Sequence, residues 1–423
     1  MTQSQPRILI ISHGHPALIA GGTEFSAYDL FCELNRSGAA DASFLACVTS
    51  LHRPAGDGSK LQSYNGAEKE YLLHVGQFDP FMLAHGIEST TLDDFGRLLD
   101  TLKPDIVHFH HLYLIGAESL ALVRNRLPQA RIVFSLHDFH AICHRDGIMV
   151  KTGSEALCSE ATPDACHGCF GDIAANRFSL RHHHLQNMLG LVDRFISPSL
   201  FLRQQYDNWG VSEHMIEWIP NGLPGDIQPL EAEARPRRNR FGFFGNIAPH
   251  KGPLLALDAL SRIDPAIELT LTIHGGLQHQ GEEFTHQFEQ AVKREGDRAH
   301  FYVPYNRDSI GRLMADMDWV IVPSTWWENA PLTILESFRH GRPVIASNMG
   351  GMAELVDDGV NGMLFRRNDV SDLARLMTQA AQEEGLWDRM GSAVPDVSPV
   401  SDTAARHMTL YASLLSHAQR RSA

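Results

Sequence analysis

Two glutamates, Glu328 and Glu336, lie in the segment whose residue types best suit ligand chemistry. Seven residues separate them, and Pro331 lies between them. Because proline lacks a backbone N–H, it suits the first turn of a helix, which places Glu328 in a loop and Glu336 inside the following helix. Carboxylates accept hydrogen bonds from sugar and ribose hydroxyls, and the free N–H groups of a helix N-terminus suit a diphosphate. Taken alone, the pair is also compatible with ordinary surface acids.

Short apolar strands and amphipathic helices alternate along the chain, which is typical of parallel sheets covered by helices. A Gly-Gly turn follows the first strand and precedes a helix that reaches about residue 36. The expected strands are residues 7–12, 42–49, 106–110, 132–136 and 194–197 in the first half, and residues 240–245, 268–274, 300–303, 319–323 and 343–347 in the second. We therefore expect an α/β fold with two doubly wound sheets.

The length of the chain predicts two domains, because 423 residues exceed the ~100–200 residues usual for one domain. The sequence Ile-Pro-Asn-Gly at 219–222, followed by a polar stretch with Pro and Arg, indicates a hinge. We expect domains over residues 1–220 and 221–400. A final helix at about 402–417 is long enough to pack back on the first domain.

An ordered series of motifs resembles the retaining nucleotide-sugar glycosyltransferases of family 4. The motifs are Gly21-Gly22-Thr23-Glu24, Ser197-Pro198-Ser199, the Ile-Pro-Asn-Gly segment, Phe-Gly-Asn leading to Lys251-Gly252, the two glutamates with their flanking residues, and Gly350-Gly351-Met352-Ala353-Glu354 ahead of Asn361-Gly362. The resemblance covers residues 7 to about 365. It implies the GT-B fold, in which two Rossmann-like domains face a cleft, with an acceptor-binding first domain and a second domain that binds the nucleotide-sugar donor. Transfer with retention needs no protein nucleophile.

The resemblance also implies residue roles. Lys251 would bind the donor diphosphate, Glu336 would bind the ribose hydroxyls, and Glu328 would lie near the hydroxyls of the transferred sugar as a catalytic residue. The implied donor-binding set is Gly21, Gly22, Asn246, Lys251, Asn329, Ala330, Leu332 and Glu336. The two glycines would allow the backbone to approach a ligand, because they lack Cβ.

His137 matches the histidine that the family places near the reacting sugar, and we assign it as the second catalytic residue. It follows a strand in the segment Ser135-Leu136-His137-Asp138. A neutral imidazole there would donate to a sugar hydroxyl or relay a proton. His108, His110 and His111 follow another strand, but the chain has 24 histidines and these three are interpreted as structural.

Asn246 departs from the family pattern, in which an arginine lies five residues before the lysine. Asparagine keeps a hydrogen-bond donor but loses the charge and the planar fork that grips phosphate. Either another cation replaces the arginine or the donor binds weakly. Arg307, Arg342 and His250 are the candidates.

Two segments suggest metals. Asp316-Met317-Asp318 has the Asp-x-Asp form of a metal site, but it directly precedes a strand and is interpreted as flanking it. Cys143, Cys158, Cys166 and Cys169 lie in an insertion after His137, with fourteen, seven and two residues between successive cysteines. Structural zinc, free thiols and a redox pair all remain open for them. The family needs no metal or other cofactor for transfer.

Composition and charge limit the partners. A formal net charge of −14 argues against nucleic acid as the main partner. Without a signal-peptide core or a run of ~20 apolar residues, the chain is expected to be cytoplasmic, with peripheral contact at the inner face of a membrane left open. The expected substrates are a nucleotide sugar and a glycan or lipid-linked acceptor. A GT-B nucleotide-sugar hydrolase or epimerase and a non-catalytic sugar-binding protein are the alternatives.

Overall fold

The computed structural model describes residues 5–51, 60–86, 89–225, 235–277, 280–302 and 304–422. The chain divides into two compact units. Unit 1 comprises Met1–Gly222 and Pro399–Ala423, and unit 2 comprises Leu223–Ser398. Each unit contains its own sheet and its own buried apolar core, so each is described by itself.

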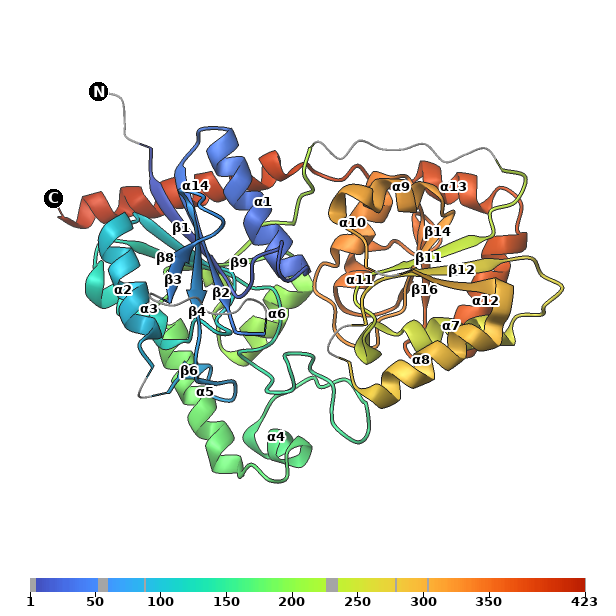
Figure 1. The fold of residues 1–423 in the computed structure, drawn as a ribbon, viewed down its shortest axis with the longest axis horizontal. Coiled ribbons are helices and arrows are strands. Elements are labelled where there is room, and N and C mark those ends of the chain that lie inside the picture. Colours follow the sequence, from blue (N-terminus) through green and yellow to red (C-terminus); the bar gives the residue numbers. More distant parts are fainter. Residues whose placement is uncertain are drawn as a thin grey trace. The chain divides into compact units, whose positions relative to one another are not determined.

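Unit 1 is built on a sheet whose described strands follow the order β10-β9-β8-β7-β1-β2-β4-β3, parallel except for the edge strand β3. Helices cover both faces, and α14 packs against α1 (Figure 1). The strands are β1 (Arg7–Ser12), β2 (Asp41–Val48), β3 (Leu61–Ser63), β4 (Glu70–His74), β7 (Ile106–Phe109), β8 (Arg131–Ser135), β9 (Arg194–Ser197) and β10 (Ile216–Trp218), with a separate small hairpin of β5 (Phe78–Asp79) and β6 (Ala84–His85). The helices are α1 (Gly22–Arg36), α2 (Thr91–Leu102), α3 (Glu118–Arg126), α4 (Pro163–Cys169), α5 (Ala175–Leu189), α6 (Leu200–Trp209), the short η1 (Glu213–Met215) and α14 (Val400–Ser422).

Unit 2 has a described sheet in the order β13-β12-β11-β14-β15-β16, with every pair parallel. Its strands are β11 (Arg240–Phe244), β12 (Thr270–His274), β13 (Ala299–Tyr302), β14 (Trp319–Val322), β15 (Val344–Ser347) and β16 (Gly362–Phe365). Its helices are α7 (Pro253–Arg262), α8 (Glu282–Glu295), α9 (Ile310–Ala315), α10 (Leu332–Arg339), α11 (Gly350–Leu355), α12 (Val370–Gln382) and α13 (Leu386–Ser392), with short turns η2 (Pro249–Lys251), η3 (Gly296–Arg298) and η4 (Arg307–Ser309).

Parallel strands covered on both faces must be apolar throughout, and the central strands have this character. Residues 8–11 of β1 and all of β14 are buried. The ten predicted strands are present, with bounds within two residues of the prediction, except that Val303 lies outside the described residues. Helix α10 begins at Leu332, so Pro331 occupies the position before the helix rather than its first turn.

Each sheet has a switch point, where the chain leaves a central strand on one side and later returns on the other. In unit 1, β1 lies between β2 and β7, and in unit 2, β11 lies between β12 and β14. Open α/β sheets bind ligands outside the carboxyl ends of the strands at such points. The candidate site residues follow these strands.

Candidate functional site

Three pairs of residues join the carboxyl ends of β7 and β8 in unit 1. Nε2 of His108 lies 2.8 Å from Oγ of Ser135, and Nδ1 of His110 lies 2.9 Å from Nε2 of His137. In the third pair, Nε2 of His111 lies 2.5 Å from Oδ2 of Asp138. The partners are 27 residues apart in every pair, because β7 and β8 are adjacent parallel strands in a fixed register.

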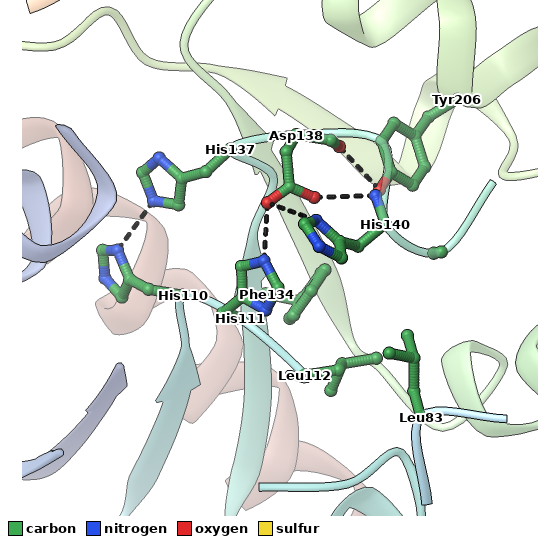
Figure 2. Close-up of a pocket in the computed structure, with 10 residues that line it drawn as sticks. Leu83, His110, His111, Leu112, Phe134, His137, Asp138, His140 and Tyr206 are labelled. Atoms are coloured by element: carbon green, nitrogen blue, oxygen red, sulfur yellow. Dashed lines mark hydrogen bonds and ion pairs between the residues drawn. The ribbon is translucent and has the colours of Figure 1, made fainter. Parts of the chain in front are cut away.

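Asp138 is the centre of this arrangement (Figure 2). One carboxylate oxygen contacts His111 and also lies 3.2 Å from Nδ1 of His140, while the other accepts the backbone N–H of His140 at 2.8 Å. The Tyr206 hydroxyl donates to the Asp138 carbonyl at 3.0 Å. Burial opposes the charge on Asp138, but His111 and His140 outweigh it and hold the pKa of the carboxyl well below its usual range. Asp138 is therefore an ionised anchor for two imidazoles.

The histidines on these strand ends are neutral near pH 7. Burial lowers the pKa of His137 to about 4, with Asp138 opposing and His111 adding to the shift. Burial likewise lowers the pKa of His111 to about 4 and holds the pKa of His110 well below its usual value. A neutral imidazole keeps one donor and one acceptor nitrogen, which suits hydrogen bonding to a hydroxyl.

A histidine–carboxylate pair lies beside this network, after β1. Nε2 of His13 lies 2.8 Å from Oε1 of Glu24, and the His13 and His111 ring centroids are 4.3 Å apart. Burial lowers the pKa of His13, but the Glu24 carboxylate outweighs burial and the net pKa is raised. Gly21 accommodates the carboxylate, since a Cβ at this position would lie 2.4 Å from Oε2 of Glu24. The absence of a side chain at Gly21 thus has a local packing reason.

His111, Asp138 and His140 are the one group of three among the described residues whose ligand atoms lie within 4.8 Å of one another. A neutral histidine binds a metal through its unprotonated nitrogen and donates from the other. His111 has the opposite arrangement, because its Nδ1 accepts the Tyr113 backbone N–H at 2.7 Å and the proton must then be on Nε2, facing Asp138. We interpret the group as a hydrogen-bonded network rather than a metal site.

In unit 2, a single carboxylate oxygen collects three donors after β14. Oε1 of Glu328 lies 2.7 Å from Nζ of Lys251, 2.7 Å from the Ser324 hydroxyl and 2.8 Å from Nε1 of Trp326. Burial raises the pKa of Glu328, but Lys251 and the two neutral donors outweigh it and the net pKa is lowered. The Lys251 ammonium also lies over the Trp326 ring, 5.0 Å from its centroid. The structure thus brings together Lys251 and Glu328, 77 positions apart in the sequence.

Close backbone contacts explain two glycines around this cluster. Gly252 has a φ of +74°, and a Cβ there would lie 2.0 Å from the Pro323 carbonyl oxygen. A Cβ on Gly351 would lie 1.5 Å from the carbonyl oxygen of Asn329, and the Gly351 N–H donates to the Glu328 carbonyl at 2.7 Å. The turn after Lys251 and the start of α11 are therefore held against the loop that carries Glu328.

The remaining predicted residues of unit 2 lie near this loop. Glu336 is buried in α10, and it adds to the burial that raises the pKa of Tyr305. Asn329 is buried, whereas Ala330 and Leu332 are half-buried. Asn246 is exposed after β11.

Arg342 does not replace the missing arginine. Its guanidinium is buried and donates to the carbonyl oxygens of Met314, Met317 and Ala315, at 3.1, 3.2 and 3.1 Å. Arg342 therefore holds the end of α9 in place. The prediction that Asp316-Met317-Asp318 flanks a strand is confirmed, since Asp318 is buried and accepts the Arg240 backbone N–H at 3.0 Å.

Two family models match the chain in succession. The model described as Glycosyltransferase Family 4 matches residues 20–225, and the model described as Glycosyl transferases group 1 matches residues 228–396. The chain belongs to glycosyltransferase family 4. This glycosyltransferase is 23% identical over 404 residues to a D-inositol 3-phosphate glycosyltransferase of Nocardioides sp., covering 88% of this chain and 80% of the relative.

Solved structures share the fold of this glycosyltransferase. HepE of Anabaena, in complex with UDP and glucose, has a TM-score of 0.68 at 16% identity and covers 97% of this chain and 100% of its own. Sucrose-phosphate synthase of Thermosynechococcus elongatus has a TM-score of 0.69 at 18% identity, with 98% and 100% covered. The predicted GT-B class and the predicted enzyme class are confirmed. No helix among the described residues is long and apolar enough to cross a membrane.

Part of the candidate site of this glycosyltransferase was not predicted from the sequence. Besides Gly21 and Gly22, the only first-half residue predicted to belong to the site was His137. The structure adds a histidine partner for His137 and a neighbouring network of polar residues: His110, His111, Asp138, His13 and Glu24. A signal for these contacts was present in the sequence, because polar residues at the ends of two predicted strands are spaced 27 residues apart. Adjacent parallel strands bring their carboxyl ends together.

Proposed function

We propose that this glycosyltransferase transfers a sugar, with retention of configuration, from a nucleoside diphosphate sugar to a hydroxyl of a glycan or lipid-linked acceptor. The cluster of Lys251, Ser324 and Trp326 on one oxygen of Glu328 supports the proposal most strongly. In this cluster a cation and an ionised carboxylate lie beyond the carboxyl ends of the strands, which is where α/β folds bind nucleotides. HepE of Anabaena, which shares the fold, has been solved in complex with UDP and glucose and with UDP-glucose, and this suggests a uridine nucleotide.

Each group would have a separate role in unit 2, the proposed donor-binding unit. The Lys251 ammonium would exchange its contact with Glu328 for the diphosphate, and Glu328 would remain ionised because Ser324 and Trp326 still donate to it. An ionised carboxylate only accepts hydrogen bonds, so Glu328 would select sugar hydroxyls. Glu336 would bind the ribose, and Asn246, Asn329, Ala330 and Leu332 would line the donor site.

Unit 1 would bind the acceptor, and Gly21 and Gly22 would lie near the ligand. Neutral His137 would hydrogen bond to a hydroxyl of the transferred sugar. The leaving phosphate departs on the face where the acceptor oxygen arrives and takes the acceptor proton, so the protein acts through positioning and charge stabilisation. The proposal includes a cytoplasmic location and, for a lipid-linked acceptor, a peripheral contact with the membrane.

A panel of nucleotide sugars tests this function. The protein is incubated with UDP-, ADP- and GDP-sugars, first in water and then with inositol phosphate, glycan and lipid-linked acceptors. Acceptor-dependent release of nucleotide, with the donor's anomeric configuration preserved in the product by NMR, is expected. Nucleotide release that needs only water would indicate a hydrolase, and conversion of the sugar without nucleotide release would indicate an epimerase. Binding without turnover would indicate a non-catalytic protein. A product with inverted anomeric configuration would contradict retention.

A further inference from the structure

Helix α14, the last helix of the chain, packs on the face of the unit 1 sheet that carries two histidines of the candidate site (Figure 1). Tyr411 of α14 belongs to one buried apolar cluster with Ile106 of β7 and Val133 of β8. Because side chains alternate along a strand, His108 and His110 project from the same face as Ile106. No residue of α14 has a role in the function proposed above.

Tyr411 forms a hydrogen bond with a buried histidine of the sheet. Its hydroxyl oxygen lies 2.7 Å from Nδ1 of His108, and the other ring nitrogen of His108 lies 2.8 Å from Oγ of Ser135. All three side chains are buried. Burial raises the pKa of Tyr411 and lowers the pKa of His108 well below its usual value, so the hydroxyl and the imidazole are both neutral. The two hydrogen bonds use both nitrogens of His108 and hold the rotation of its ring.

His108 is in turn packed against the pair that contains His137. The ring centroids of His108 and His110 are 4.3 Å apart, with the planes tilted by 42°. His110 stacks on His137, with ring centroids 5.1 Å apart, and the two rings share a hydrogen bond. Nε2 of His110 has no hydrogen-bond partner among the described residues. Besides its contact with His137, the orientation of His110 therefore depends on packing against His108.

Packing alone leaves these rings room to rotate. A small cavity adjoins them, lined by His110, Ser135 and His137 at the ends of β7 and β8 and by Thr403 and His407 of α14. The torsion that rotates an imidazole has broad minima, and a side chain beside a cavity lacks contacts on that side. The hydrogen bonds of the His108 ring therefore hold an orientation that packing does not enforce.

We propose that Tyr411 is a positioning residue for sugar transfer, which holds the His108 imidazole and through it the His110–His137 pair. This role rests on the proposed function of His137, which contacts the transferred sugar, whereas Tyr411 touches no substrate. Loss of the Tyr411 hydroxyl would leave Nδ1 of His108 without its partner and allow the ring to turn. His110 would then shift, and the nitrogen of His137 that it contacts would lose its alignment.

Steady-state kinetics of Tyr411→Phe test the proposal, because this variant removes the hydroxyl and keeps the ring. We expect kcat to fall roughly tenfold, since small displacements of a reacting group are costly. The KM of the donor and the Kd of the nucleotide should stay within about twofold, because uniform binding is unaffected. Thr409→Ala is the matched control, since Thr409 is exposed on α14 and its hydroxyl donates to the Ala405 carbonyl of the same helix at 3.0 Å.

A double-variant comparison separates positioning from a general loss of stability. In His108→Gln the amide lies close to the place of Nε2, so it reaches Ser135 but not Tyr411. This variant should have the same kcat as Tyr411→Phe. The double variant should be no slower than either single one, because both changes break the same hydrogen bond.

Nitrogen-15 spectra of histidine-labelled protein give a second readout, which needs no known donor. The resonances of His108, His110 and His137 are assigned by their loss in His108→Gln, His110→Asn and His137→Ala. In Tyr411→Phe all three sets of resonances should shift, and in Thr409→Ala none should.

The outcomes distinguish this role from the function on which it rests. Wild-type kcat in Tyr411→Phe, with a lowered kcat in His137→Ala, would overturn the role of Tyr411 alone. Wild-type kcat in His137→Ala would overturn both. Multiplied losses in the double variant, or spectral shifts confined to His108, would also overturn the positioning role, because Tyr411 would then only stabilise the fold.

Discussion

Nδ1 of His110 lies 2.9 Å from Nε2 of His137, and burial keeps both imidazoles neutral near pH 7. The pair therefore shares one proton. The other nitrogen of His110, Nε2, is buried and has no hydrogen-bond partner among the described residues. An unpaired buried acceptor is better tolerated than an unpaired N–H, so we assign the shared proton to Nδ1 of His110. This assignment leaves Nδ1 of His137 protonated and able to donate.

His110 is predicted to position His137, so replacing it should affect turnover more than donor affinity. We expect His110→Leu to lower kcat by roughly 10–100-fold with a small change in KM, because His137 loses the partner that fixes its tautomer. His110→Asn should recover part of the rate, since the amide N–H donates from a position close to Nδ1. Steady-state kinetics with a donor that the enzyme turns over measure this effect, and the control is His183→Asn, because His183 is exposed on α5. Wild-type kcat in His110→Leu would remove the positioning role.

Acid should destabilise unit 1 at mild pH. The folded pKa of His111, of His137 and of His407, a buried residue of α14, is about 4, whereas the unfolded value is about 6.5. Between these values the unfolded chain binds more protons, so stability is complete above pH ~6.5 and falls as the pH decreases toward about 4. Each such histidine contributes a slope of up to ~1.4 kcal/mol per pH unit, and His13, whose pKa is raised, acts in the opposite direction. Urea unfolding at several pH values measures the slope, and stability that is constant from pH 7 to 5 would contradict the neutral buried histidines.

The Lys251–Glu328 ion pair should have separable contributions to stability and to activity. Lys251→Met removes one of the three donors to a buried carboxylate and should cost about 1–3 kcal/mol of unfolding free energy. Combining it with Glu328→Gln should cost less than the sum of the single changes, because neither charge is then left alone. Turnover should be lost in all three variants. Lys293→Met on α8, where the lysine is exposed, is the matched control. Additive stability losses would show that the ion pair has no coupling energy.

Gly351→Ala should displace the loop that carries Glu328. The added Cβ would lie 1.5 Å from the Asn329 carbonyl oxygen, a contact that only backbone movement relieves. We expect a lower melting temperature and weaker nucleotide binding in this variant. Gly281→Ala is the control, because a Cβ at Gly281 meets nothing within 4 Å. Equal melting temperatures and affinities in the two variants would contradict the close approach at Gly351.

Most of the fold could be predicted from the sequence, because parallel strands buried on both faces leave long apolar runs. β1 and β9 were predicted with their observed bounds. The strands that escaped prediction were short or mixed in polarity. β10 has three residues, β16 begins with glycine, and the five residues of β4 have polar residues at both ends.

The sites were less predictable, because side-chain partners depend on register and packing. Lys251 and Glu328 were each recognised by motif, but their contact depends on Gly252 approaching Pro323. Arg342 was a candidate cation for the phosphate, but its buried guanidinium donates to backbone carbonyls of α9 instead. The histidine pairs follow from the pairing of β7 with β8, which the pattern of either strand alone does not specify.

Calorimetric titration with nucleoside diphosphates tests the central claim most directly. UDP, ADP and GDP are titrated into the wild-type protein, Lys251→Met, Glu336→Gln and the control Lys293→Met, with EDTA present to exclude metal. We predict that one nucleotide binds the wild type and the control with similar affinity. In the other two variants its Kd should rise at least ~tenfold, which is a loss of about 1.4 kcal/mol or more of binding free energy. Undiminished binding in both Lys251→Met and Glu336→Gln, or no nucleotide binding to the wild type, would contradict the donor site in unit 2.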